Sequence, residues 1–193
     1  MRVVLATSNT HKVNELQALL PTLSLVGQDT FNIESAAETG LTFIENALIK
    51  ARHAADSAGL PALADDSGLV VPALEGAPGI ISARYAGEDA TDTDNNQKLL
   101  RALDKIAHRD AFFFCCLVLI SHAEDPTPLI ATGRWHGEII RQPKGRHGFG
   151  YDQLFRVHGL DCTAAELTRE EKGQRSHRGL AARELHKIIS SER

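Results

Sequence analysis

Two adjacent acids, Asp65 and Asp66, follow a short apolar stretch and precede Ser67 and Gly68. In α/β proteins ligands bind at the carboxyl ends of strands, and Mg²⁺ takes one or two protein carboxylates together with water and phosphate oxygens. Glu38, in an earlier polar loop, could supply another ligand. The acids therefore predict a magnesium site that handles phosphate, although an Asp-Asp-Ser-Gly surface turn would have the same composition. In a continuous strand the two carboxylates would face opposite sides, so we expect a turn at Gly68 that lets them converge.

A polar loop at residues 7–12 lies between a short apolar segment and a predicted helix. The N-terminus of a helix presents unpaired N–H groups and the positive end of the helix dipole, which attract anions. Lys12 adds a cation, and Lys50, which shares a helix face with Asn46, could reach the same phosphate. The loop lacks the glycine pattern of a P-loop or a Rossmann fingerprint. It therefore predicts a phosphate contact of another kind, with a capping loop and solvated lysines as the alternative.

Two further segments have the composition of a ligand site. Phe149 lies between two glycines and could stack on a base, while Asp152 could bond the edge of that base. A hairpin turn with a core aromatic residue would have the same composition. Lys172, His177 and Arg178 surround the start of the last predicted helix, again a favourable place for an anion. An exposed basic turn is the alternative there.

Composition narrows the class of protein. Of the 193 residues, 42% are apolar and 24% are charged, which excludes a disordered chain. The net charge of −4 argues against a polymeric nucleic acid as partner. The three cysteines show no metal-ligand spacing, which favours buried thiols in a reducing compartment. No apolar run approaches the ~20 residues of a membrane helix. We therefore expect a cytoplasmic protein that has no membrane partner.

Apolar periodicity predicts the elements that must position these residues. Strands are expected at 3–6, 62–64, 69–71, 112–120, 129–135 and 138–141, and a second apolar patch lies at 23–26. Helices are expected at 13–20, 42–59, 91–107, 168–172 and 176–190. The breaks fall at the acidic pair and at residues 136–137, where a hairpin is expected. The interleaved order favours an α/β fold with a mixed central sheet flanked by helices, formed by a single domain over residues 1–193.

Taken in order, the motifs of this chain resemble those of the inosine triphosphate pyrophosphatase family, in its bacterial branch that acts on dITP, ITP and XTP. The resemblance runs from Val3 to about Lys187. The residues that carry it are Thr7-Ser8-Asn9 with Lys12, Glu38-Thr39-Gly40, Phe43-Ile44-Glu45-Asn46-Ala47, Ala64-Asp65-Asp66-Ser67-Gly68-Leu69, Gly76-Ala77-Pro78-Gly79, Ser82-Ala83-Arg84-Tyr85, Gly148-Phe149-Gly150-Tyr151-Asp152 and Ser176-His177-Arg178-Gly179.

The resemblance implies a Mg²⁺-dependent hydrolase that converts a non-standard purine nucleoside triphosphate to its monophosphate and pyrophosphate, and so cleanses the nucleotide pool. It further implies two lobes around a substrate cleft and a homodimer. It places catalysis on Asp66 and Lys12, and metal binding on Asp66, Glu38 and Asp65. The substrate contacts that it implies are Thr7, Ser8, Asn9, Thr10, His11, Lys12, Lys50, Ser67, Phe149, Gly150, Tyr151, Asp152, Lys172, His177 and Arg178.

Two other functions stay open on the sequence. A Maf-like nucleotide pyrophosphatase of different base preference would combine the same loop, metal and phosphate residues. A nucleotide-binding regulatory module without turnover is the alternative outside the enzymes. The clustered carboxylates tell against that module, because a protein that only binds phosphates gains nothing from acids beside them.

Overall fold

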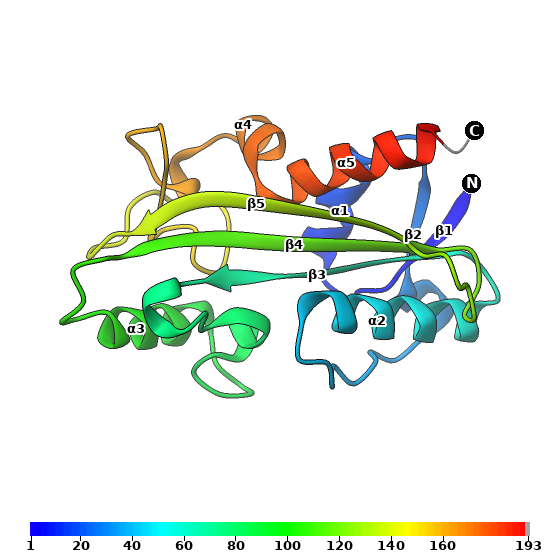
Figure 1. The fold of residues 1–193 in the computed structure, drawn as a ribbon, viewed down its shortest axis with the longest axis horizontal. Coiled ribbons are helices and arrows are strands. Elements are labelled where there is room, and N and C mark those ends of the chain that lie inside the picture. The colour runs from blue at the N-terminus through cyan, green and yellow to red at the C-terminus, as the bar shows by residue number, and fades with distance from the viewer. Residues whose placement is uncertain (192–193) are drawn as a thin grey trace. The chain divides into compact units, whose positions relative to one another are not determined.

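The computed structural model describes residues 1–191, apart from the side chain of His11. Within these residues one six-stranded sheet has the strand order β2-β1-β3-β4-β5-β6 (Figure 1). The strands are β1 (Arg2–Leu5), β2 (Ser24–Gly27), β3 (Ala62–Val70), β4 (Asp110–Ile120), β5 (Leu129–Ile139) and β6 (Phe155–Val157). Strand β1 pairs in parallel with β2 and β3, whereas β5 and β6 are antiparallel, which confirms the mixed sheet.

The described α-helices are α1 (Thr10–Leu19), α2 (Phe43–Ala58), α3 (Asp92–Ala102), α4 (Arg169–Arg175) and α5 (His177–Ser191). Helix α2 begins and ends where the sequence indicates: the Thr42 side chain accepts the N–H of Glu45, and Gly59 closes the helix with φ 63°. Helix α3 ends at Ala102, earlier than predicted. The chain leaves the helical conformation at Leu103, which has φ −96° and ψ 6°, and the carbonyl of this residue accepts from the buried side chain of Arg109.

Two of the predicted strand breaks are wrong. Strand β3 runs without interruption through Asp65 and Asp66, and no turn forms at Gly68. Strand β5 likewise continues through the residues expected to form a hairpin. Gly137 is there for a different reason: a Cβ atom at this position would collide with the backbone of Arg156 and the ring of Phe155. This glycine therefore marks the close approach of β6 rather than a turn.

The chain divides into two compact units, each with a core of its own. Unit 1 comprises Met1–Ser67, Cys115–Gly133 and His177–Arg193, and unit 2 comprises Gly68–Phe114 and Arg134–Ser176. The largest core side chains of unit 1 are Leu5, Leu16, Leu20, Leu23, Leu63, Leu117 and Leu185. Within unit 1, Figure 1 shows α1 and α5 on one face of the strands and α2 on the other.

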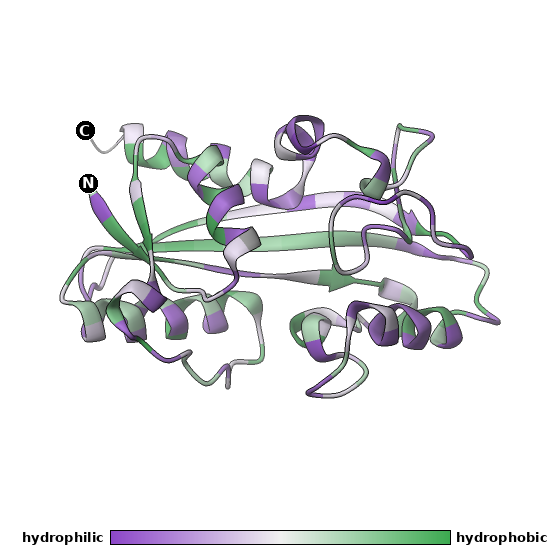
Figure 2. Ribbon diagram, turned by 180° about the vertical axis from the view of Figure 1, so that it is seen from behind, coloured by the Kyte–Doolittle hydropathy of each residue, from purple (hydrophilic) through white to green (hydrophobic). Residues whose placement is uncertain are grey.

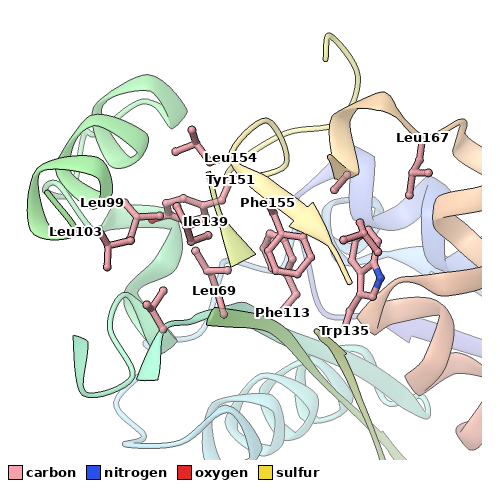
Figure 3. Packing of buried hydrophobic residues seen from close by; sticks show 14 residues of the cluster. Leu69, Leu99, Leu103, Phe113, Trp135, Ile139, Tyr151, Leu154, Phe155 and Leu167 are labelled. Atoms are coloured by element: carbon pink, nitrogen blue, oxygen red, sulfur yellow. The ribbon is translucent and has the colours of Figure 1, made fainter. Parts of the chain in front are cut away.

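Unit 2 is built around aromatic rings (Figure 3). The ring of Phe155 lies 4.7 Å from that of Phe113 and 5.3 Å from that of Trp135, measured between centroids. Such tilted pairs are favourable beyond the area that they bury. Strand β4 is hydrophobic over most of its length (Figure 2), in agreement with its predicted central place. Among the described helices, none combines the length and the apolar character needed to span a bilayer.

Candidate active site

The acidic pair of β3 presents its carboxylates to opposite faces of the strand, because side chains alternate along an extended chain. Both are buried, with Asp65 1% and Asp66 5% exposed. Ionised carboxylates at such depth need compensating charges. Each finds them in a different place: Asp65 meets cations from α1 and α5, and Asp66 meets a lysine from α2.

On the Asp65 face, Arg178 Nε donates to Asp65 Oδ2 over 2.8 Å, and Lys12 Nζ lies 3.3 Å from the same oxygen. Burial by itself would raise the pKa of Asp65, but the two cations hold it well below its ordinary value. Arg178 also donates to Ser67 Oγ at 2.7 Å and contacts Glu15 Oε2 at 3.3 Å. This network fixes the position of Lys12 beside the polar loop.

On the Asp66 face, Lys50 Nζ lies 2.6 Å from Asp66 Oδ1 and 2.9 Å from Glu38 Oε1. It also donates to the backbone carbonyl of Asp65. Burial raises the pKa of Asp66 to about 6, with Glu38 adding to the rise and Lys50 opposing it. The second oxygen, Asp66 Oδ2, is buried and has no hydrogen-bond partner in the described part of the chain. A buried acceptor of this kind needs a partner, which a cation or a water can provide.

These contacts decide which acids can share a cation. Asp66 and Glu38 face the same lysine, whereas the carboxylate of Asp65 is turned away and engaged by two cations. The described residues contain no group of three or more His, Cys, Asp or Glu side chains arranged around a metal position. Two carboxylates completed by water and phosphate oxygens are nevertheless the usual donor set of Mg²⁺. The residues present therefore fit that ion at Asp66 and Glu38.

Helix α1 begins at Thr10, three residues before its predicted start, so the polar segment at residues 7–12 comprises a short loop and the first turn of the helix. Asn9 Oδ1 accepts the N–H of Lys12, and Thr7 Oγ1 accepts the N–H of Asn9, so both side chains order the start of the helix. Ser8 Oγ donates to Asp29 Oδ1 at 2.8 Å. Thr10 is the first residue of α1, and the side chain of His11 lies outside the described part of the structure. Thr7 and Asn9 thus act as capping residues. This does not conflict with a phosphate contact by the same segment.

A second group of predicted residues lies in unit 2. Asp152, 3% exposed, accepts the N–H of Phe149 at 2.9 Å and pairs with Lys172 Nζ at 2.5 Å, both through Oδ2. The same ammonium lies 5.0 Å from the centroid of the Phe149 ring, which is 36% exposed. Tyr151 is buried and donates its hydroxyl to the carbonyl of Ser82. Asp152 therefore binds groups of its own loop and of α4. The sequence had suggested the edge of a base as its partner.

We expect Gly148→Ala to damage this loop more than Gly150→Ala. Both glycines have positive φ, 80° and 61°, which costs an alanine about 1 kcal/mol. A Cβ atom at Gly148 would in addition collide with the carboxylate of Asp152, while at Gly150 nothing lies within 4 Å. The free energy of unfolding of each variant, measured in urea, checks this order. Equal losses would contradict it.

The structure thus brings together Lys12, Glu38, Lys50, Asp65, Asp66, Ser67 and Arg178 in unit 1, and Phe149, Gly150, Tyr151, Asp152 and Lys172 in unit 2. His177 is the first residue of α5 and is buried. Sequence reasoning missed Glu15, although its position three residues after Lys12 puts both on one helix face. It also missed Asp92 and Asn96, which bond to the backbone of Gly150 and for which the sequence contains no local signal.

In this α/β fold, two buried acids of β3 meet lysines from α1 and α2, which are groups that an enzyme acting on phosphoric anhydrides can use. Comparison with known proteins makes this specific. The model of the Ham1 family matches residues 3–188, and the chain belongs to this family. The resemblance drawn from the motifs is thereby confirmed.

The relatives are similar over nearly their whole length. The dITP/XTP pyrophosphatase of Yersinia pseudotuberculosis is 60% identical over 184 residues, 93% of each chain. That of Escherichia coli K12 is 57% identical over 188 residues, 95% of each. A solved HAM1 protein from Coxiella burnetii superposes with a TM-score of 0.94 at 48% identity, covering 99% of both chains. The Ham1 protein of Staphylococcus aureus gives 0.90 at 39% identity over the full length of both.

Proposed function

We propose that this chain hydrolyses non-standard purine nucleoside triphosphates, dITP, ITP and XTP, to the monophosphate and pyrophosphate. The observation that carries the proposal is Asp66, a buried carboxylate with a raised pKa, one oxygen on a lysine and the other without a partner among the described residues. Groups with these properties are typical of proton acceptors in active sites. The names of the relatives, dITP/XTP pyrophosphatases, point to two of these substrates, dITP and XTP.

In the proposed reaction Asp66 accepts the proton of the water that attacks the α-phosphorus. Lys12 and the N–H groups at the start of α1 stabilise the charge that moves onto the pyrophosphate. Lys50 holds Asp66 Oδ1 and thereby orients the carboxylate. Mg²⁺, when bound by Asp66 and Glu38, would neutralise phosphate oxygens. Asp65 has another role, which is to hold Lys12 and Arg178 in place.

Base recognition is assigned to unit 2 and to the start of α5. The exposed ring of Phe149 stacks on the purine, and N–H groups donate to the keto oxygen at its six position, where adenine carries an amino group. His177 and Arg178 are the side chains predicted to supply such donors. The contacts of Arg178 with Asp65, Ser67 and Glu15 give it a positioning role in addition.

One assay tests the function. The purified protein is incubated with Mg²⁺ and XTP, ITP or dITP, and the products are separated; ATP, GTP and dTTP serve as controls. We expect monophosphate and pyrophosphate from the first three nucleotides and no turnover after exhaustive chelation. Release of orthophosphate as the first product, or full activity with chelator, would overturn the proposal. A preference for dTTP would favour a Maf-like activity, and binding without turnover a regulatory module.

Three further proposals concern the domain organisation, the oligomeric state and the cellular compartment of the protein. We propose that both units act as one pyrophosphatase domain over residues 1–193, assembled as a homodimer, which light scattering can decide. The three cysteines are free thiols, two of them buried, which supports a reducing, cytoplasmic setting. No polymeric nucleic acid or membrane is needed in this scheme.

A further inference from the structure

Side chains of helix α3 bind both backbone polar groups of one residue in the Phe149 loop, Gly150. Asp92 Oδ2 accepts the N–H of Gly150 over 2.6 Å, and Asn96 Nδ2 donates to the carbonyl of the same glycine over 2.8 Å. The two side chains are four residues apart, so they share one face of the helix. Both backbone polar groups of Gly150 are thus bound by residues more than fifty positions away in the chain.

The helix that makes these bonds is itself anchored. Thr91 and Asp94 form a reciprocal capping box at its first turn. The side chain of Asn95, 2% exposed, donates to the carbonyl of Ala83 and accepts the N–H of Ala86. These bonds tie α3 to the segment that contains Ser82, whose carbonyl accepts the hydroxyl of Tyr151. Gly150 and Tyr151 are therefore both held by one rigid scaffold within unit 2.

This anchoring matters because of the glycines beside Phe149. Gly148 and Gly150 both have positive φ, and glycine loses more conformational freedom on ordering than any other residue. Without external bonds, the segment between them would have to be ordered when a base stacks on Phe149. The affinity for the substrate would then be lower, since ordering a binding loop costs free energy at the moment of binding.

We propose that Asp92 and Asn96 are positioning residues for base recognition, which act by holding the backbone of Gly150 so that the Phe149 ring is ordered before the substrate binds. The inference rests on the proposed function, because it assumes that Phe149 receives the purine. Neither side chain touches the reacting phosphate in this scheme. Removal of either side chain should therefore weaken binding of the base and leave the rate of the chemical step unchanged.

Steady-state kinetics with XTP tests the proposal through a split between KM and kcat. We expect Asp92→Ala and Asn96→Ala each to raise KM roughly five- to tenfold, the worth of one hydrogen bond, with kcat within about twofold of the wild-type value. Gln97→Ala, an exposed position on the same helix, is the matched control and should change neither. A variant that only loses folded protein would lower kcat at unchanged KM, which would contradict the proposal.

Two isosteric changes sharpen the test. Asp92→Asn keeps an oxygen that accepts the N–H of Gly150, so KM should stay close to the wild-type value. Asn96→Asp removes the donor and places a carboxylate oxygen against the Gly150 carbonyl, so KM should rise at least as far as in Asn96→Ala. In the background of Phe149→Ala, the Asp92 and Asn96 changes should have little further effect, because they act through the ring. Additive effects in that background would overturn the proposal.

Hydrogen exchange provides a measurement that does not depend on activity. The amides of residues 149–152 should exchange faster in Asp92→Ala and Asn96→Ala than in the wild type or in Gln97→Ala. Unchanged protection would show that α3 does not order the loop and would refute the inference even in an active enzyme. Conversely, a wild-type protein that does not hydrolyse XTP would refute the proposed function while this measurement still decides the role of α3.

Discussion

Replacement of Asp66 by asparagine is expected to lower kcat for XTP by about 10³-fold, because an amide cannot accept the proton of the attacking water. At saturating Mg²⁺ the effect should lie in kcat, since the Phe149 loop and the polar segment at residues 7–12 are left intact. Steady-state kinetics on the purified variant measures it. Asp56→Asn, on the exposed side of α2, is a matched control that should retain full activity. A turnover within tenfold of the wild-type value would remove Asp66 from its assigned role.

The free energy of unfolding should depend on pH through the same residue. The folded pKa of about 6 exceeds the ordinary value of 3.8, so Asp66 favours the folded state most when it is protonated. This contribution is complete below pH 3.8 and is lost as the pH rises through 6. The neutral asparagine mimics the protonated form and can still accept from Lys50. The metal-free variant should therefore be at least as stable as the wild type at pH 8, which separates lost catalysis from lost folding.

Replacement of Arg178 by alanine should produce the largest loss of stability, about 3 kcal/mol at pH 7. It removes the closest cation from a fully buried carboxylate, and breaking a buried pair from one side leaves an uncompensated charge. Urea unfolding measures the free energy. Arg183→Ala, an exposed arginine of the same helix, should change it by less than about 0.5 kcal/mol. An Arg178→Ala protein that unfolds like the wild type would contradict this account of Asp65.

The loss should shrink in acid, and the sign follows from the direction of the pKa shift. The pKa of Asp65 is held below its ordinary value of 3.8, so its stabilising contribution is present above that pH and disappears as the pH falls through the folded pKa. In Arg178→Ala the carboxyl group loses this support and protonates more readily. The difference between the wild type and the variant should therefore be largest near neutral pH and smaller at pH 4.

Sequence patterns predicted an element correctly where the element is determined by its own residues and needs no partner from a distant part of the chain. The helix from Thr42 to Gly59 was predictable because both of its ends are determined by neighbouring residues. The apolar strand β4 was predictable because its composition leaves it no stable place outside a core. The break expected in β3 was wrong for the opposite reason. Acids enter a buried strand when cations from other elements meet them, and those cations cannot be seen within the strand's own sequence.

By itself the sequence determined the family, the mixed α/β class and the set of acids, lysines and glycines available for chemistry, because residue types and their order are properties of the chain alone. Only the tertiary structure decided the partners. Alternation along β3 sends Asp65 to Arg178 and Asp66 to Lys50, and so gives neighbouring carboxylates opposite pKa shifts. It also brings α3 to Gly150, a contact between distant segments that depends on how the helix packs and that no local pattern encodes.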